Sequence, residues 1–163
     1  FYRFSLKHNQ LNKNKFKYYF PKNIILTNVD FDHPDFFKNE LHYFKTFKNF
    51  TSKTLNENGF ILYNFDDLNS RKLFKVSKTN TASFGFNKKS DYQIKNPNES
   101  LNKFQIFKKG EKILDIKLSV YGNHNILNAA AASLMALELG EAKKLIQNRL
   151  SEFKGAKRRM EIR

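Results

Sequence analysis

The stretch KNIILTNVDFDHPDFF, from Lys22 to Phe37, passes from an apolar run into a group of acids and then into a new apolar pattern. The run Lys22–Val29 predicts a short buried strand. Pro34 suits the first turn of a helix. Apolar residues then recur at helical spacing and predict an amphipathic helix over residues 34–51; they are Phe37, Leu41, Phe44 and Phe47. A strand that leads directly into a helix is the repeating unit of α/β sheets.

The polar group between this strand and helix contains Asp30, Asp32, His33 and Asp35. In open α/β sheets, ligands bind beyond the carboxyl ends of the strands. Oxygen and imidazole ligands gathered there could hold a divalent cation, and carboxylates suit Mg²⁺. The other interpretation is that Asp32 or His33 caps the helix while the remaining acids face water. The spacing alone leaves both open.

The rest of the chain continues the α/β pattern. Gly59 precedes a second strand, FILYNF, and a short helix opened by Asp66 is predicted over Asp66–Val76. Four short alternating runs between residues 82 and 120 predict a small antiparallel β meander. A buried Ala-rich helix that ends at Gly140 and an amphipathic helix over Glu141–Phe153 follow. The predicted fold is therefore a sheet flanked by helices.

The composition fits a folded domain in the cytoplasm. The chain has 163 residues, 40% of them hydrophobic, with 18 Phe and 7 Tyr, which is enough to form a core. No apolar run approaches the ~20 residues of a membrane span, and no secretion leader is recognisable. The absence of cysteine excludes disulfides and thiolate metal sites. Because the chain starts at Phe1 and stops within a charged phrase, we expect a piece of a longer protein.

The formal net charge of +15 raises the alternative of a basic nucleic-acid-binding domain. The lysines are spread along the chain rather than concentrated in one segment, and the bias toward Lys, Asn, Phe and Ile is typical of AT-rich coding. We therefore interpret most of the charge as a solvated basic surface and expect no nucleic-acid partner.

Two further motifs carry groups that suit a nucleotide. GNHNILN places His124, Asn125 and Asn128 at the start of a helix, where they share one face and can read a purine edge; the alternative is an ordinary helix N-cap. FKGAKRRMEIR places Arg158 and Arg159 after a glycine, which suits phosphate or a basic hinge. The sequence contains neither G-x-S-x-G nor the phosphate-binding G-x-x-x-x-G-K-[ST] loop.

Taken in order, these phrases resemble the Mur ligases, the ATP-dependent ligases of peptidoglycan synthesis. They are PKNIILTNVDFDHPDFF, SFGFNKKSDYQI, YGNHNILNAAAASLMALELG and FKGAKRRMEIR, and they extend from about Lys15 to Arg163. The resemblance implies the later part of a central ATPase domain over residues 1–156 and a hinge over residues 157–163, within a three-domain protein. The phosphate loop and both flanking domains would lie elsewhere, and the start of the chain departs from the family pattern.

The resemblance also implies site residues. His33 would bind Mg²⁺ and take part in catalysis, with Asn28 and Asp32 in support. His124, Asn125 and Asn128 would lie at the adenine of ATP. Arg159 would reach the nucleotide phosphates and take part in catalysis. Lys45 and Lys48 are, by position only, candidates for carbamylation.

The implied reaction joins an amino acid or peptide to UDP-N-acetylmuramate through an acyl phosphate. Members that use L-alanine or a recycled tripeptide fit best. The phrases at Tyr18–Phe37 and GAKRRMEIR favour the recycling ligase, whereas HNILNAAAA is at least as similar to the L-alanine ligase. A folate-polyglutamate-type ligase is an alternative on the same fold. The acceptor, the number of subunits and the integrity of the parent gene stay open.

Overall fold

The computed structural model describes residues 19–31, 37–74, 80–98 and 102–155. In these ranges, ten helices and strands follow one another along the chain: β1 (Asn23–Leu26), α1 (Glu40–Asn56), β2 (Phe60–Asn64), α2 (Leu68–Phe74), β3 (Thr81–Gly85), β4 (Tyr92–Asn98), β5 (Lys103–Lys108), β6 (Glu111–Lys117), α3 (Asn123–Glu138) and α4 (Lys143–Glu152). Within the same ranges, no helix combines enough length and apolar character to cross a membrane.

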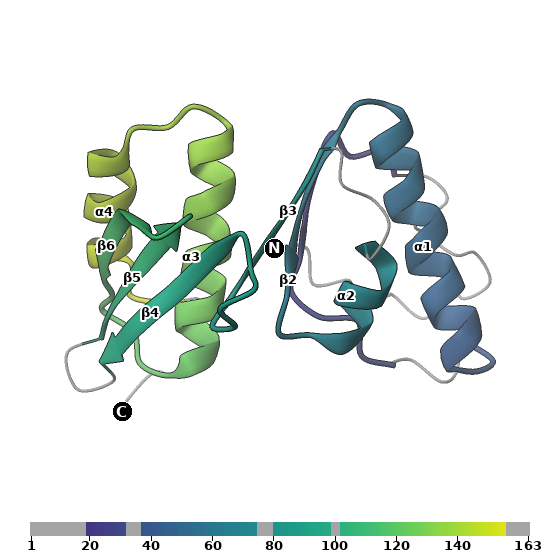
Figure 1. Ribbon diagram of the computed structural model, residues 1–163, viewed down its shortest axis with the longest axis horizontal. Coiled ribbons are helices and arrows are strands. Elements are labelled where there is room, and N and C mark those ends of the chain that lie inside the picture. Colours follow the sequence, from purple (N-terminus) through teal and green to yellow (C-terminus); the bar gives the residue numbers. More distant parts are fainter. Residues whose placement is uncertain (1–18, 32–36, 75–79, 99–101, 156–163) are drawn as a thin grey trace.

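The six strands form one mixed sheet in which their spatial order is their order along the chain (Figure 1). The strands from β1 to β4 are parallel, and β4, β5 and β6 are joined by antiparallel pairs. The predicted α/β class, with helices beside a sheet that carries a small antiparallel meander, is confirmed.

β3 was expected to open the meander, and that detail is wrong. It pairs in parallel with both of its neighbours. Parallel strands usually need a long crossover because the chain must return along the whole strand. Here the overlap of β3 with β4 is only two residue pairs, Phe84 with Tyr92 and Gly85 with Gln93, so a short loop suffices.

The helices cover both faces of the sheet. In Figure 1, α1 and α2 lie on one side of β1 and β2, and α3 and α4 lie on the other. The larger hydrophobic core joins the sheet to α3 through buried residues such as Leu62, Phe84, Ile106 and Ala130. A smaller core, built on Ile24, Leu26, Val29, Ile61 and Phe74, lies under α1 and α2. An Ala-rich helix suits the larger core because short side chains let the helix approach the sheet closely.

α1 begins later than the periodicity predicted, at Glu40 instead of residue 34, because the side chain of Asn39 caps it. Asn39 Oδ1 accepts a hydrogen bond from the His42 backbone N–H at 2.9 Å. Phe37 is buried but precedes the helix, and Leu41 is 60% exposed. The face that meets the sheet carries Phe47, as predicted, and also Tyr43, Phe50 and buried threonines.

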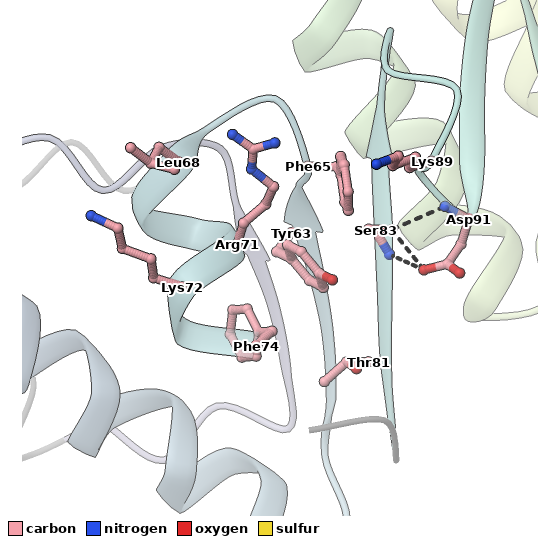
Figure 2. A pocket seen from close by; sticks show the side chains of 10 residues that line it. All are labelled: Tyr63, Phe65, Leu68, Arg71, Lys72, Phe74, Thr81, Ser83, Lys89 and Asp91. Carbon is pink, nitrogen blue, oxygen red and sulfur yellow. Dashed lines mark hydrogen bonds between the residues drawn. The ribbon is translucent and has the colours of Figure 1, made fainter. Parts of the chain in front are cut away.

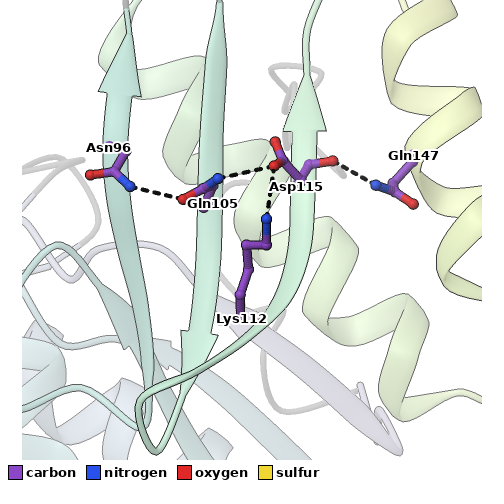
Figure 3. A network of polar contacts seen from close by, with 5 residues as sticks. All are labelled: Asn96, Gln105, Lys112, Asp115 and Gln147. Atoms are coloured by element: carbon purple, nitrogen blue, oxygen red, sulfur yellow. Dashed lines mark hydrogen bonds and ion pairs between the residues drawn. The ribbon is translucent and has the colours of Figure 1, made fainter.

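The last three strands carry a polar ladder on one face (Figure 3). Asn96 donates to Gln105 at 2.8 Å, and Gln105 donates to the Asp115 carboxylate at 3.0 Å. The Gln105 hydrogen bond and then the ion pair with Lys112 hold the pKa of Asp115 below its usual value. Gln147 of α4 donates to the Asp115 carbonyl at 2.7 Å, so the ladder also ties α4 to β6.

Candidate functional site

The candidate site lies at the end of the sheet toward which the parallel strands run. In Figure 1, β1 and β2 run toward the same end of the molecule at which α3 begins. α3 packs against β1, β2 and β3, and its first turn lies at the end of the molecule toward which these strands run. This is the edge at which open α/β sheets bind ligands.

The exit of β1 contributes Asn28 and Asp30, and both are exposed. The Asn28 amide donates to the Asp30 carboxylate at 2.7 Å, and Thr27 Oγ1 donates to Asn28 Oδ1 at 3.3 Å. Asn28 therefore orients Asp30, and its supporting role at the site stays a prediction. Asp32, His33 and Asp35 lie outside the described residues.

Of the residues around the predicted metal site, the structure describes Asn28 and Asp30. Asn28 and Asp30 supply oxygen atoms of the kind that Mg²⁺ prefers. Among the residues that the structure describes, no three His, Cys, Asp or Glu side chains come together as a metal site would require. The assignment of Mg²⁺ to His33 stays a prediction.

The first turn of α3 carries the three residues expected at the adenine. His124 is exposed, and Asn125 and Asn128 are partly exposed, on the face given by their spacing. The alternative interpretation, in which an Asn or His caps this helix, is wrong, because the N-cap is Gly122 and no side chain caps the turn. The Asn125 amide donates to the Tyr121 carbonyl at 2.6 Å, which ties this side chain to the backbone just before α3.

Gly122 is needed where it stands. Its φ is 101°, a conformation that side chains disfavour, and a Cβ there would lie 3.1 Å from both Cε1 and Nδ1 of His124. The imidazole of His124 thus lies against the backbone of Gly122. The first amide N–H groups of α3 have no side-chain cap, and a helix of this length attracts anions at that end.

Two acids follow β2, and each binds the backbone that follows a different neighbouring strand. This role was not predicted from the sequence. The Asp66 carboxylate accepts the backbone N–H groups of Phe86 at 2.7 Å and Asn87 at 3.1 Å, after β3. Asp67 accepts the backbone N–H of Val29 at 3.1 Å, after β1. Asp67, and not Asp66, caps α2. The available signal was an acidic pair directly after a buried strand.

A hollow of about 720 Å³ lies between α2 and the strands β2 and β3 (Figure 2). Tyr63, Phe65 and Arg71 line it, and the Arg71 guanidinium lies 5.3 Å from the Phe65 ring centre. Ser83 Oγ donates to Asp91 at 2.7 Å on its far side, and burial raises the pKa of the Tyr63 phenol above its usual value. The phrase SFGFNKKSDYQI contributes Ser83, Lys89 and Asp91 to this hollow, although no site was predicted there from the sequence.

The remaining expected site residues are not placed. Arg158 and Arg159, with the hinge over residues 157–163, lie outside the described residues. Lys45 and Lys48 are exposed on α1, and nothing in the described contacts favours one of them for carbamylation.

A family model described as Mur ligase middle domain matches residues 6–136 of the chain. Among curated proteins, the UDP-N-acetylmuramate–L-alanine ligase of Carboxydothermus hydrogenoformans is 35% identical over 144 residues, which cover 87% of this chain and 31% of the relative. The ligase of the same name from Clostridium acetobutylicum is 36% identical over 154 residues, covering 93% of this chain and 33% of the relative. The chain thus spans about a third of the length of these relatives.

Solved structures with a similar fold carry related names. The UDP-N-acetylmuramate:L-alanyl-γ-D-glutamyl-meso-diaminopimelate ligase from Neisseria meningitides superposes with a TM-score of 0.75 at 25% identity, covering 90% of this chain and 44% of that one. The UDP-N-acetylmuramate-alanine ligase of Thermotoga maritima gives a TM-score of 0.71 at 26% identity, covering 87% of this chain and 31% of that one.

Proposed function

The chain belongs to the Mur ligase family, and on that premise we propose that it is part of an ATP-dependent ligase that joins an amino acid or a peptide to UDP-N-acetylmuramate. The observation that carries the proposal is that β1 and β2 run toward the end of the molecule at which α3 begins, and that α3 packs against both strands. Two of the phrases that carry the resemblance lie at the exit of β1 and at the start of α3. Family membership also makes a nucleic-acid partner unnecessary to explain the charge.

Each group of residues has a separate task in this proposal. His124, Asn125 and Asn128 hold the adenine, and the uncapped amides at the start of α3 face the anionic part of the nucleotide. Asn28 and Asp30 support His33 at the β1 exit, and Arg159 reaches the nucleotide phosphates. Mg²⁺, when bound there, offsets the charge of the transferred phosphoryl group.

The proposed reaction has two steps. A carboxylate oxygen of UDP-N-acetylmuramate attacks the γ-phosphorus of ATP, and ADP leaves. The amine of the acceptor then attacks the acyl carbon, the acyl–oxygen bond breaks, phosphate leaves, and the ammonium proton is lost to yield the amide. Positioning and charge stabilisation account for most catalysis of phosphoryl transfer, so the domain needs only to align the nucleotide with the carboxylate.

We propose L-alanine as the acceptor to be tested first. Relatives that are 32–36% identical bear the name of the L-alanine ligase, whereas the structural neighbours at 25–26% identity include both this ligase and the tripeptide ligase. The recycling ligase, which the sequence phrases favoured, stays a prediction.

The deciding experiment measures phosphate release by the complete protein with ATP, Mg²⁺ and UDP-N-acetylmuramate. L-alanine and the L-alanyl-γ-D-glutamyl-meso-diaminopimelate tripeptide are supplied separately. Stimulation by one of them names the acceptor. No stimulation by either, in a folded protein that binds ATP, would contradict the muramate assignment and favour another ligase on the same fold.

A further inference from the structure

The first turn of α2 holds the backbone of Val29 from both sides. Asp67 Oδ1 accepts the Val29 N–H at 3.1 Å, and the Asn69 side-chain amide donates to the Val29 carbonyl at 2.8 Å. Val29 itself is 1% exposed. Both backbone polar groups of a buried residue are therefore satisfied by side chains that lie nearly forty positions later in the sequence.

These contacts replace strand pairing that has already stopped. The parallel ladder of β1 with β2 ends at the pair Leu26 and Tyr63, so Val29 lies beyond it. Its side chain still packs into the small core with Ile24 and Phe74. The two contacts from α2 thus extend the fixed path of the backbone past the end of the strand.

The carboxylate of Asp67 is itself held in place. Its Oδ1 accepts the Ser70 backbone N–H at 2.7 Å and the Ser70 hydroxyl at 2.5 Å, and Ser70 is fully buried. Hydrogen bonds to an ionised acceptor are among the stronger ones in proteins. One oxygen atom therefore caps α2 and fastens the β1 exit at the same time.

We propose that Asp67 and Asn69 are positioning residues for the ligase reaction. By fixing the chain at Val29, they set where Asn28 and Asp30 stand at the β1 exit. The inference rests on the proposed function, since it assigns these two residues to the same site. A misplacement of about 1 Å at a reacting centre can cost about a hundredfold in rate.

The test compares two variants of the complete protein with a matched control. Asn69→Asp removes the amide donor at constant size and leaves the Asp67 cap intact. Asp67→Ser keeps an oxygen that can cap α2 but shortens its reach toward Val29. Asn49→Asp makes the same chemical change as the first variant at an exposed position of α1. The measurements are kcat, the KM for ATP, the melting temperature and amide exchange over residues 28–31.

We expect Asn69→Asp and Asp67→Ser to lower kcat by about tenfold or more and to leave the KM for ATP within about twofold, because the adenine contacts lie on α3. Amide exchange over residues 28–31 should accelerate while α3 and β5 exchange as before. Asn49→Asp should behave as wild type. A lower melting temperature with an unchanged kcat per folded molecule would overturn the proposal, as would a KM effect equal to the kcat effect.

Failure of the proposed function would look different. If the wild-type protein releases no phosphate with either acceptor, the ligase assignment falls, and amide exchange still tests whether Asp67 and Asn69 fix the backbone at Val29. Unchanged exchange over residues 28–31 in Asn69→Asp would then show that they do not, and faster exchange would show that they do. If Asp67→Ser does not fold, Asn69→Asp alone carries the test.

Discussion

Gly85 lies where a side chain would strike the carboxylate of Asp66. A Cβ at this position would be 2.6 Å from Asp66 Oδ2, the oxygen that accepts the Phe86 N–H. We expect Gly85→Ala to lower the free energy of unfolding by about 1–3 kcal/mol, the usual cost of overpacking. Chemical denaturation of the complete protein measures this cost.

The control repeats Gly85→Ala in an Asp66→Ala background. Asp66→Ala is itself destabilising because it leaves the Phe86 and Asn87 amides without their acceptor. It also removes the atom that the new methyl group would strike. The added cost of Gly85→Ala should therefore shrink, and an equal cost in both backgrounds would exclude the clash as its cause.

His33 and His124 are predicted to affect different kinetic constants. In the complete protein, His33→Ala should lower kcat by about a hundredfold or more, the scale of losing a strong electrostatic stabiliser. His124→Ala, on the exposed face of the first turn of α3, should mainly raise the KM for ATP. Steady-state kinetics with varied ATP separate the two effects, and a near-wild-type kcat for His33→Ala would remove His33 from the site.

Residue types were easier to predict than the direction of each side chain. The shared face of His124, Asn125 and Asn128 follows from helix geometry and could be predicted. The roles of Asp66 and Asp67 could not, because they depend on which neighbouring strand each carboxylate meets, and these neighbours lie far away in the sequence.

Among the helices, α1 shows how periodicity can extend beyond an element. Phe37 packs against the Tyr43 ring at 4.7 Å between ring centres although it precedes the helix. The aromatic spacing therefore continues upstream of the N-cap, and the predicted start was six residues early. For α4, the predicted range of residues 141–153 agrees with the observed helix, Lys143–Glu152.

The cap of α1 gives a prediction at the scale of the element. Asn39→Ala removes the acceptor of the His42 N–H and should cost about 1 kcal/mol of the free energy of unfolding. Asn49→Ala changes an exposed residue within the same helix and should be neutral or slightly stabilising, because Ala has the higher helix propensity. Equal losses in the two variants would contradict the capping role.

At the scale of the molecule, we predict that the 163 residues alone do not turn over substrate. The chain spans about a third of the length of its curated relatives, and its sequence lacks the phosphate-binding loop motif. A phosphate-release assay with both acceptors checks this, with the complete protein as the positive control. Measurable turnover by the 163 residues would contradict it.

The family could be identified from the sequence because several phrases occur in one order, whereas no single phrase decides it. The acceptor could not be predicted in the same way, since the resemblance assigns its recognition to a domain outside this chain. The mixed sheet was only partly predictable. An alternating run such as ASFGF is compatible with parallel or antiparallel neighbours, and pairing decides between them.

The arrangement of the sheet has a consequence for how the protein is made. Because the strands lie side by side in the order in which they are synthesised, each new strand that leaves the ribosome meets a partner already present at the growing edge. The acids after β2 then fasten β1, which is older, and the turn after β3, which is younger. From β1 onward, pairing of the described strands can thus follow the order of synthesis, and α3 closes the core after β6 is in place.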